Sequence, residues 1–112
     1  MYPRFAETCE TVLRLRNHRE GLIRRTVINL IPILAAYDPP DFINYYLDQS
    51  MTHLIGQVQI DKERKPVNEM DRSIAFLAIG KLAIVAKQDM AVYLDDTMRC
   101  IKDSLRAKRW GQ

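Results

Sequence analysis

Glycine is scarce in this sequence, and its scarcity excludes a large group of nucleotide-binding proteins. The 112 residues include only four glycines, at positions 21, 56, 80 and 111. No two of them lie close enough together to build the glycine-rich loop that cradles phosphate groups. The sequence therefore excludes P-loop and Rossmann chemistry.

Cysteine and histidine are also rare. Cys9, Cys100, His18 and His53 do not stand at any familiar spacing of a zinc site. We therefore expect no metal and no cofactor, and free, mostly packed thiols in a reducing compartment. Charges in the first ten residues, and Pro32 or charged residues within the longest apolar runs, also argue against a signal peptide or a membrane span.

The sequence does contain a helical pattern. It is 47% hydrophobic and 28% charged with a formal net charge of +3, a composition that allows a soluble domain with a core. Apolar residues recur at helical spacing nearly throughout, and strand-like alternation never persists. The periodicity predicts five helices, over about residues 5–16, 22–36, 39–57, 69–87 and 90–106.

Local signals refine these helices. Pro32 stands inside the second helical pattern, where we expect it to cause a kink. Asp38, Asn68 and Asp89 are placed to cap the third, fourth and fifth helices. The charged stretch 59–67 has no apolar period and is expected to form an exposed loop.

The chain repeats itself internally. Residues 46–54 align without gaps on residues 93–101, at an offset of 47, and the second helix aligns on the fourth at an offset of 48, which matches Arg24 with Arg72. The first helix joins the series at an offset of 42. The order A-B-A-B-A and the period near 47 residues predict an all-α, HEAT/armadillo-like α-α superhelix (solenoid) fragment.

The repeat also predicts the domain organisation. Unit one covers about residues 5–37, unit two covers about 38–87 with an inserted loop at 59–67, and about 89–106 form the first helix of a third unit. Solenoids end in capping units with a polar outer face. The apolar patterns of the first and last predicted helices show no such polar face. We therefore expect exposed apolar faces at both ends, and association of the chain through them.

Two stretches resemble a known family. VINLIPILAAY at residues 27–37 and IAFLAIGKLAIVA at 74–86, with Tyr46-Leu47 and Lys62-Glu63-Arg64, closely resemble the N-terminal HEAT region of target-of-rapamycin (TOR) serine/threonine protein kinases. The resemblance covers about residues 5–105, and the segment 65–71 is longer than the family's link.

The resemblance implies a large, mainly cytoplasmic kinase, associated with endomembranes such as the vacuole or lysosome, that controls growth in response to nutrients. It also implies that the HEAT solenoid supports a homodimeric complex and docks a Raptor-type subunit that recruits substrates. The kinase motifs of the family are absent from these residues, so this segment would belong to the scaffold.

No set of residues in the sequence favours catalysis. His18-Arg19-Glu20 is similar to the kinase motif His-Arg-Asp, but Arg25 occupies the place of the required asparagine. Asp95 and Asp96 point in different directions around a helix, which places them poorly as an acid/base pair. We therefore predict no catalytic residue. An enzymatic function ranks third, after a protein-interaction scaffold and a basic adaptor.

A cluster of arginines is the strongest surface feature. Arg14, Arg16, Arg19 and Arg25 form a candidate interaction surface for an acidic partner. They leave open an alternative function, a free-standing basic helical adaptor that binds nucleic acid or acidic lipid, although surface aromatics for base stacking are missing.

Four residues are expected to serve the repeat itself. Arg24 and Arg72 occupy the same repeat position, where the resemblance implies a structural role in bonding neighbouring turns. Pro32 is expected to shape its helix, and Gly80, with Ala75 and Ala78, to allow a close approach between helices.

Overall fold

The computed structural model describes residues 3–59 and 68–110, and the side chains of residues 4–59 and 68–106. Within these ranges every regular element is a helix and no strand occurs, so the predicted all-α fold is confirmed. The elements are α1 (Pro3–Arg14), α2 (Gly21–Tyr37), α3 (Pro39–Tyr45), α4 (Leu47–Val58), α5 (Glu69–Ala86), the 3₁₀ helix η1 (Lys87–Tyr93) and α6 (Leu94–Trp110). Of the predicted loop 59–67, residues 60–67 lie outside the described part of the chain.

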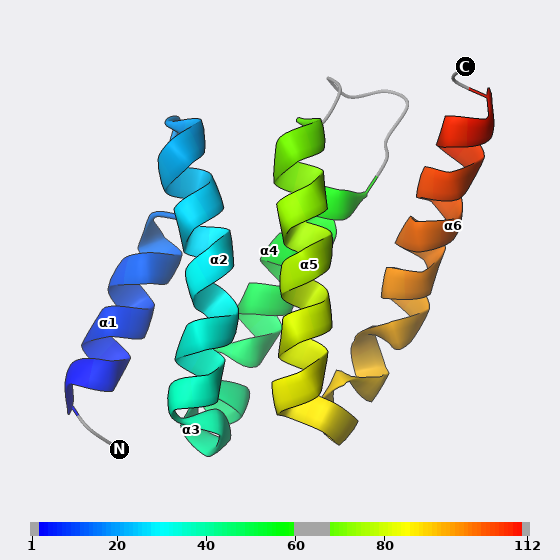
Figure 1. Cartoon of the computed structure of the whole chain (residues 1–112). Helices are drawn as coiled ribbons and strands as arrows, with labels where there is room; N and C mark the ends of the chain where they lie inside the picture. Colours follow the sequence, from blue (N-terminus) through cyan, green and yellow to red (C-terminus); the bar gives the residue numbers. More distant parts are fainter. Residues whose placement is uncertain (1–2, 60–67, 111–112) are drawn as a thin grey trace.

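The helices form a flat slab of two layers. In Figure 1, α2 and α5 lie side by side and run in the same direction, α4 lies behind them, and α1 and α6 stand on either side. Both α2 and α4 contact α5, and the molecule measures 49 × 32 × 18 Å. The sequence repeat aligns α2 with α5 and α4 with α6, and in the structure α2 and α5 lie side by side in the front layer.

The core lies between the two layers and draws on both. Its largest fully buried apolar side chains come from α2, α3, α4 and α5, which all turn their apolar faces to this space. These side chains are Ile28, Ile31, Phe42, Met51, Leu54, Val58 and Leu82.

Two predicted helices are divided in the structure. The helix expected over 39–57 is interrupted at Tyr46, whose backbone (φ −129°, ψ −15°) leaves the helical region. The Tyr46 ring packs against Phe5 and Phe42, so the break accompanies a tyrosine that is buried in the core. The helix expected over 90–106 begins within η1. This 3₁₀ helix follows α5 directly, and its first residue, Lys87, has a φ of 50°.

The predicted caps have mixed outcomes. Asp38 accepts a hydrogen bond from the amide of Asp41, and Asn68 accepts bonds from the amides of Met70 and Asp71, as expected for N-caps. The prediction for Asp89 is wrong, because this residue lies within η1.

The proline and glycine of the repeat behave differently. Pro32 is buried, and α2 continues through it to Tyr37, so the helix does not stop there. Gly80 does not provide the expected close approach, since it is exposed and a β-carbon there would meet no atom within 4 Å. Ala75 and Ala78 are the small residues that are buried on α5.

The two outer helices differ in what they expose. On α1, Phe5, Cys9 and Leu13 are buried against the core. The residues that α1 exposes are polar: Arg4, Glu7, Thr8, Glu10, Thr11 and Arg14. The expectation of an exposed apolar face is therefore wrong at α1, where the stripe packs onto α2, but it is confirmed at α6, where Leu94, Met98 and Leu105 are exposed.

Candidate functional site

A buried carboxylate joins the two helices of the front layer. Asp71, in the first turn of α5, pairs with two arginines of α2: its Oδ2 lies 3.2 Å from Arg24 Nε, and its Oδ1 lies 3.1 Å from Arg25 Nη1. The Asp71 side chain is 4% exposed, against 26% and 24% for Arg24 and Arg25. We call these three residues the Asp71 clamp; it fixes α2 beside α5 at the ends where both helices begin.

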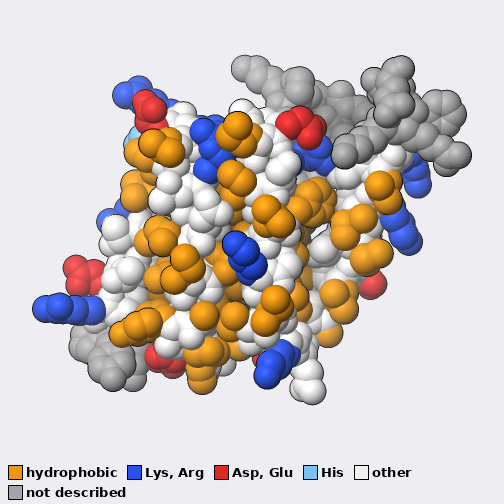
Figure 2. Space-filling view, viewed as in Figure 1, with side chains coloured by type: hydrophobic (Ala, Val, Ile, Leu, Met, Phe, Trp, Pro, Cys, Tyr) orange, Lys and Arg blue, Asp and Glu red, His pale blue; other side chains and the backbone are white. Residues whose placement is uncertain are grey.

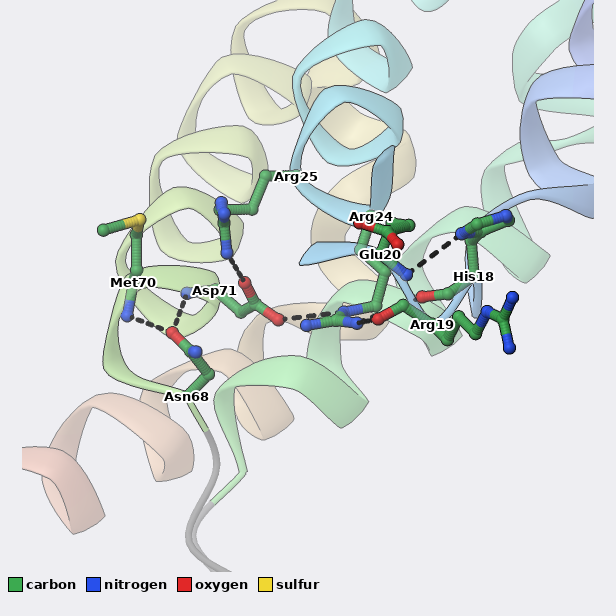
Figure 3. A network of polar contacts seen from close by, with 8 residues as sticks. All are labelled: His18, Arg19, Glu20, Arg24, Arg25, Asn68, Met70 and Asp71. Atoms are coloured by element: carbon green, nitrogen blue, oxygen red, sulfur yellow. Dashed lines mark hydrogen bonds and ion pairs between the residues drawn. The ribbon is translucent and has the colours of Figure 1, made fainter. Parts of the chain in front are cut away.

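The clamp also holds the turn between α1 and α2. Arg24 Nη1 donates to the carbonyl oxygens of His18 (3.1 Å) and Arg19 (2.8 Å), as Figure 3 shows. The imidazole Nδ1 of His18 accepts a bond from the amide of Glu20 at 3.0 Å. One guanidinium therefore connects the turn, α2 and α5.

The four arginines of the predicted interaction surface do not share one environment in the structure. Arg25 belongs to the Asp71 clamp, and Arg16 is half-buried and donates to the carbonyl of Leu13 at 2.6 Å. Arg14 and Arg19 are exposed. The structure thus does not gather the four side chains of the cluster into one basic surface.

Arg72, the repeat equivalent of Arg24, has different partners. It is 9% exposed, pairs with the exposed Glu69 one turn away, and donates to Ser104 Oγ of α6. Its guanidinium also lies over the ring of Phe76, 5.9 Å from the centroid. Its Nε is buried without a hydrogen-bond partner, whereas Nε of Arg24 bonds Asp71.

Burial shifts the pKa values of two ionisable side chains that pack in or against the core. Burial, with smaller contributions from Glu10 and Asp38, raises the pKa of the Cys9 thiol to about 11. Burial and then the hydrogen bond to Asp48 raise the pKa of Tyr93 to about 12. Cys9 is therefore neutral and unreactive near pH 7, a packed thiol rather than a nucleophile.

In the described ranges, no three His, Cys, Asp or Glu residues come together as they would to hold a metal ion. None of the helices described is long and apolar enough to cross a membrane.

An open groove of about 610 Å³ lies between α4 and the junction of η1 with α6. The hydroxyl of Tyr93 donates to Asp48 Oδ1 across it at 2.9 Å. Asp96 lines the groove and pairs with the exposed Arg99. The groove is therefore lined by two carboxylates, Asp48 and Asp96, and by one tyrosine hydroxyl that is held by the first of them.

The outer surface of α2 and α5 is rich in apolar side chains. Figure 2, seen from this side, shows many hydrophobic atoms with few charged side chains between them. The exposed large apolar residues on these helices are Leu22, Ile33, Tyr37, Met70, Leu77 and Ile84. Exposed apolar patches of this kind are typical of protein interaction surfaces.

The fold and its contacts define the class of the chain as an all-α helical-repeat segment, in which ion pairs to the buried Asp71 join the two front helices. The chain is similar to TOR serine/threonine kinases. It is 38% identical over 104 residues to serine/threonine-protein kinase tor1 of Schizosaccharomyces pombe, a match that covers 93% of this chain and 4% of that protein. It is 27% identical over 104 residues to mTor of Drosophila melanogaster (93% of this chain, 4% of that protein) and 28% identical over 109 residues to TOR of Arabidopsis thaliana (97% and 4%).

The chain thus spans about 4% of the length of these curated relatives. No protein-family model matches it, and no solved structure matches it. The resemblance to TOR kinases is confirmed over 93% of the chain, and the placement of the segment in their N-terminal HEAT region stays a prediction.

Sequence reasoning missed Asp71 as a partner of the arginines. The signal was present: at an offset of 48, Asp71 stands where unit one has Ile23, so an acid replaces an apolar residue next to the repeated arginine. An acid at an otherwise apolar position of a buried helix requires a cation nearby.

Proposed function

We propose that the chain is a non-catalytic, HEAT-type scaffold segment of a TOR-type serine/threonine protein kinase, which serves protein–protein interaction and complex assembly. The observation that carries the proposal is the match to TOR kinases over 93% of this chain but 4% of the relative, in a segment built as a helical repeat. A kinase active site cannot be formed by so small a helical segment, whereas a stacked repeat provides an extended surface.

The structure supports a scaffold in two ways. The Asp71 clamp gives the two front helices a fixed relative position, and rigid elements present a binding surface at low entropic cost. The apolar outer face of α2 and α5 supplies the kind of surface that a protein partner covers.

The finer parts of the proposal follow the resemblance. Residues 5–37 and 38–87 form two repeat units and 89–106 begin a third; the parent kinase is homodimeric and cytoplasmic; and a Raptor-type subunit docks on its solenoid. The Arg14–Arg25 cluster gives less support to a basic adaptor, because Arg16 and Arg25 already have partners within the chain.

A chimera of the fission-yeast kinase tests the proposal. The matching segment of tor1 is replaced by this chain, and the purified kinase is assayed for phosphorylation of a short peptide and for its co-purifying proteins. We expect both to stay within about twofold of the unaltered kinase. A second chimera, with Asp71→Asn, should lose co-purifying proteins while its turnover of the short peptide stays the same.

Two results would overturn the proposal. If the Asp71→Asn chimera loses peptide turnover while its assembly stays intact, the segment acts in catalysis. If deletion of the segment leaves assembly unchanged, it is no scaffold. A matched Asp96→Asn chimera, which removes only the exposed pair with Arg99, controls for the loss of a carboxylate.

A further inference from the structure

The two layers of the slab expose different kinds of side chain. The exposed residues of α4, in the back layer, are Asp48, Gln49, Thr52 and Gly56, and none of them is a large apolar residue. The outer side of α2 and α5, in the front layer, carries large apolar side chains that are between 58% and 75% exposed (Figure 2). We call these residues, together with Lys81 of α5, the front face: Leu22, Ile33, Tyr37, Met70, Leu77 and Ile84. Of the two layers, the front one therefore offers an apolar surface to a partner.

The apolar residues that α5 gives to the front face follow one line along the helix. Met70, Leu77 and Ile84 are spaced by about two turns, so they lie above one another on the side of α5 that is turned away from the core. Lys81 lies on the same line, one turn after Leu77 and one turn before Ile84. It is exposed, and among the described residues its ammonium has no ion pair and no hydrogen bond. The front face thus has an unpaired cation within its apolar line.

No carboxylate of the front layer is available to Lys81. Helix α2 contains no Asp or Glu. On α5, Asp71 is buried in its clamp and Glu69 pairs with Arg72. A partner that covers the front face takes Lys81 out of water, which is unfavourable unless a counter-charge comes with the partner. Charge complementarity therefore requires a carboxylate in the middle of the partner's apolar surface.

The Tyr37 ring of the front face is held in place from behind. It stacks on Phe5 of α1, with 5.8 Å between the ring centroids and 17° between the planes, and Tyr37 is still 70% exposed. A ring that is fixed before binding loses little entropy when a partner covers it. Tyrosine and methionine, which the front face both contains, are enriched at protein–protein interfaces. These features favour a protein as the partner.

The front layer also determines the shape of the partner. Helices α2 and α5 lie side by side and run in the same direction over 17 and 18 residues (Figure 1). They offer no sheet edge, so an extended segment laid on them would face apolar side chains without partners for its backbone N–H and C=O groups. A helix satisfies its own backbone and presents an apolar stripe along its length. The line from Met70 to Ile84 is about 21 Å long, which corresponds to about four turns of helix.

We infer that the front face binds an amphipathic helix of a partner protein, about four turns long, whose apolar stripe carries in its middle a carboxylate that pairs with Lys81. The inference rests on the proposed scaffold function and adds the chemistry of the partner to it. A second copy of the chain fits less well, because front-to-front contact brings a second Lys81 and no acid. A membrane surface also fits less well, because helices that lie on bilayers carry their lysines on the polar side and not within the apolar stripe.

A pair of designed peptides tests the carboxylate. Each is an amphipathic helix of alanine and glutamine with one leucine stripe, blocked at both ends and as long as α5, and the central stripe position is glutamate in one peptide and glutamine in the other. The fluorescent peptides are titrated with the 112-residue chain and followed by anisotropy. We expect saturable binding of the glutamate peptide and about tenfold weaker binding of the glutamine peptide, because a charge-assisted hydrogen bond is lost. With Lys81→Met, a change at an exposed position that keeps the fold, the two peptides should bind equally.

The apolar part of the front face is tested with two double variants of the chain. Leu77→Gln, Ile84→Gln should bind the glutamate peptide at least tenfold more weakly, because both leucine-stripe contacts on α5 are lost. Met98→Gln, Leu105→Gln is the matched control: it also replaces two exposed apolar residues, but on α6, and should bind like the unaltered chain. All four side chains are between 47% and 75% exposed, so the replacements leave the core intact.

The inference is overturned if neither peptide binds saturably, if both bind the unaltered chain equally, or if the α6 variant weakens binding as much as the front-face variant does. Two further measurements assign the front face to another occupant. A dimer in sedimentation that Leu77→Gln, Ile84→Gln dissociates would assign it to a second copy of the chain. Co-sedimentation with phosphatidylserine vesicles that the same variant abolishes would assign it to a membrane.

The peptide assay contains no kinase, so its failure and the failure of the proposed function can be told apart. If the chimeras contradict the scaffold but the glutamate peptide binds as expected, the front face is a helix-binding surface with another role. If the chimeras behave as expected but the peptides do not, the scaffold uses a different surface.

Discussion

At the scale of single residues, Asp71 is the buried carboxylate that joins α5 to Arg24 and Arg25 of α2. Asp71→Asn keeps the size of the side chain but removes the charge that Arg24 and Arg25 share. Breaking a fully buried pair costs about 3–5 kcal/mol, and since both arginines are about a quarter exposed, we expect a loss of about 2 kcal/mol in the free energy of unfolding. Urea denaturation measures it.

The control for Asp71 is an exposed pair in the same chain. Asp96 and Arg99 lie 3.3 Å apart with side chains 51% and 70% exposed. Asp96→Asn should therefore change the unfolding free energy by less than about 0.5 kcal/mol. Equal losses for the two variants would show that burial of Asp71 does not matter.

His53 should make the stability of the chain depend on pH. Burial, and to a lesser degree the charge of Arg16, lowers the pKa of His53 from its ordinary 6.5. Above pH 6.5 the imidazole is neutral in both the folded and unfolded states; as the pH falls below 6.5 the unfolded chain takes up the proton first, so stability is lost. Unfolding midpoints of the unaltered chain and of His53→Gln between pH 7.5 and 5.5 should diverge, with the steeper fall in the unaltered chain.

A second histidine variant controls for that measurement. His18→Gln alters the turn before α2 and leaves His53 in place, so the steeper fall below pH 6.5 should persist. Parallel pH profiles for the unaltered chain and His53→Gln would contradict the assignment.

At the scale of the helices, α5 carries a glycine that its packing does not need. Gly80 has ordinary helical geometry, and a β-carbon there would meet nothing within 4 Å. Gly80→Ala should therefore raise the unfolding free energy by about 0.5–1 kcal/mol, because alanine loses less backbone entropy on folding. Ala78→Leu is the contrasting change: Ala78 is buried, and overpacking there should cost about 1–3 kcal/mol. A destabilised Gly80→Ala would mean that α5 approaches another helix there.

The sequence predicted the positions of the helices better than the breaks and junctions between them. Periodicity and the Asn68 cap placed α5 within a residue of Glu69–Ala86, because capping and amphipathicity are local properties. The break at Tyr46 depends on rings from α1 and α3 that meet only in the folded chain. No local pattern distinguishes that tyrosine from Tyr45, which is exposed.

The arginine cluster shows the same limit for the site. Arg25 was grouped with the exposed arginines because they are close in sequence, but its partner is 46 residues away on α5. Only the packing of α2 on α5 decides which arginine meets Asp71. The repeat, a long-range signal that is visible in the sequence, separates Arg24 from the cluster by matching it with Arg72.

At the scale of the whole molecule, stability should be uneven across the slab, and amide hydrogen exchange measures this. The central helices α2 and α5 are packed on each other and on α4, so their slowest amides should open only on global unfolding. Helix α6 leaves its apolar stripe exposed and should open at a lower free energy. Helix α1 is the internal control, since it is also an outer helix but buries Phe5, Cys9 and Leu13, and should rank between them. If α6 exchanged as slowly as α5, the exposure of its apolar stripe would not weaken the helix.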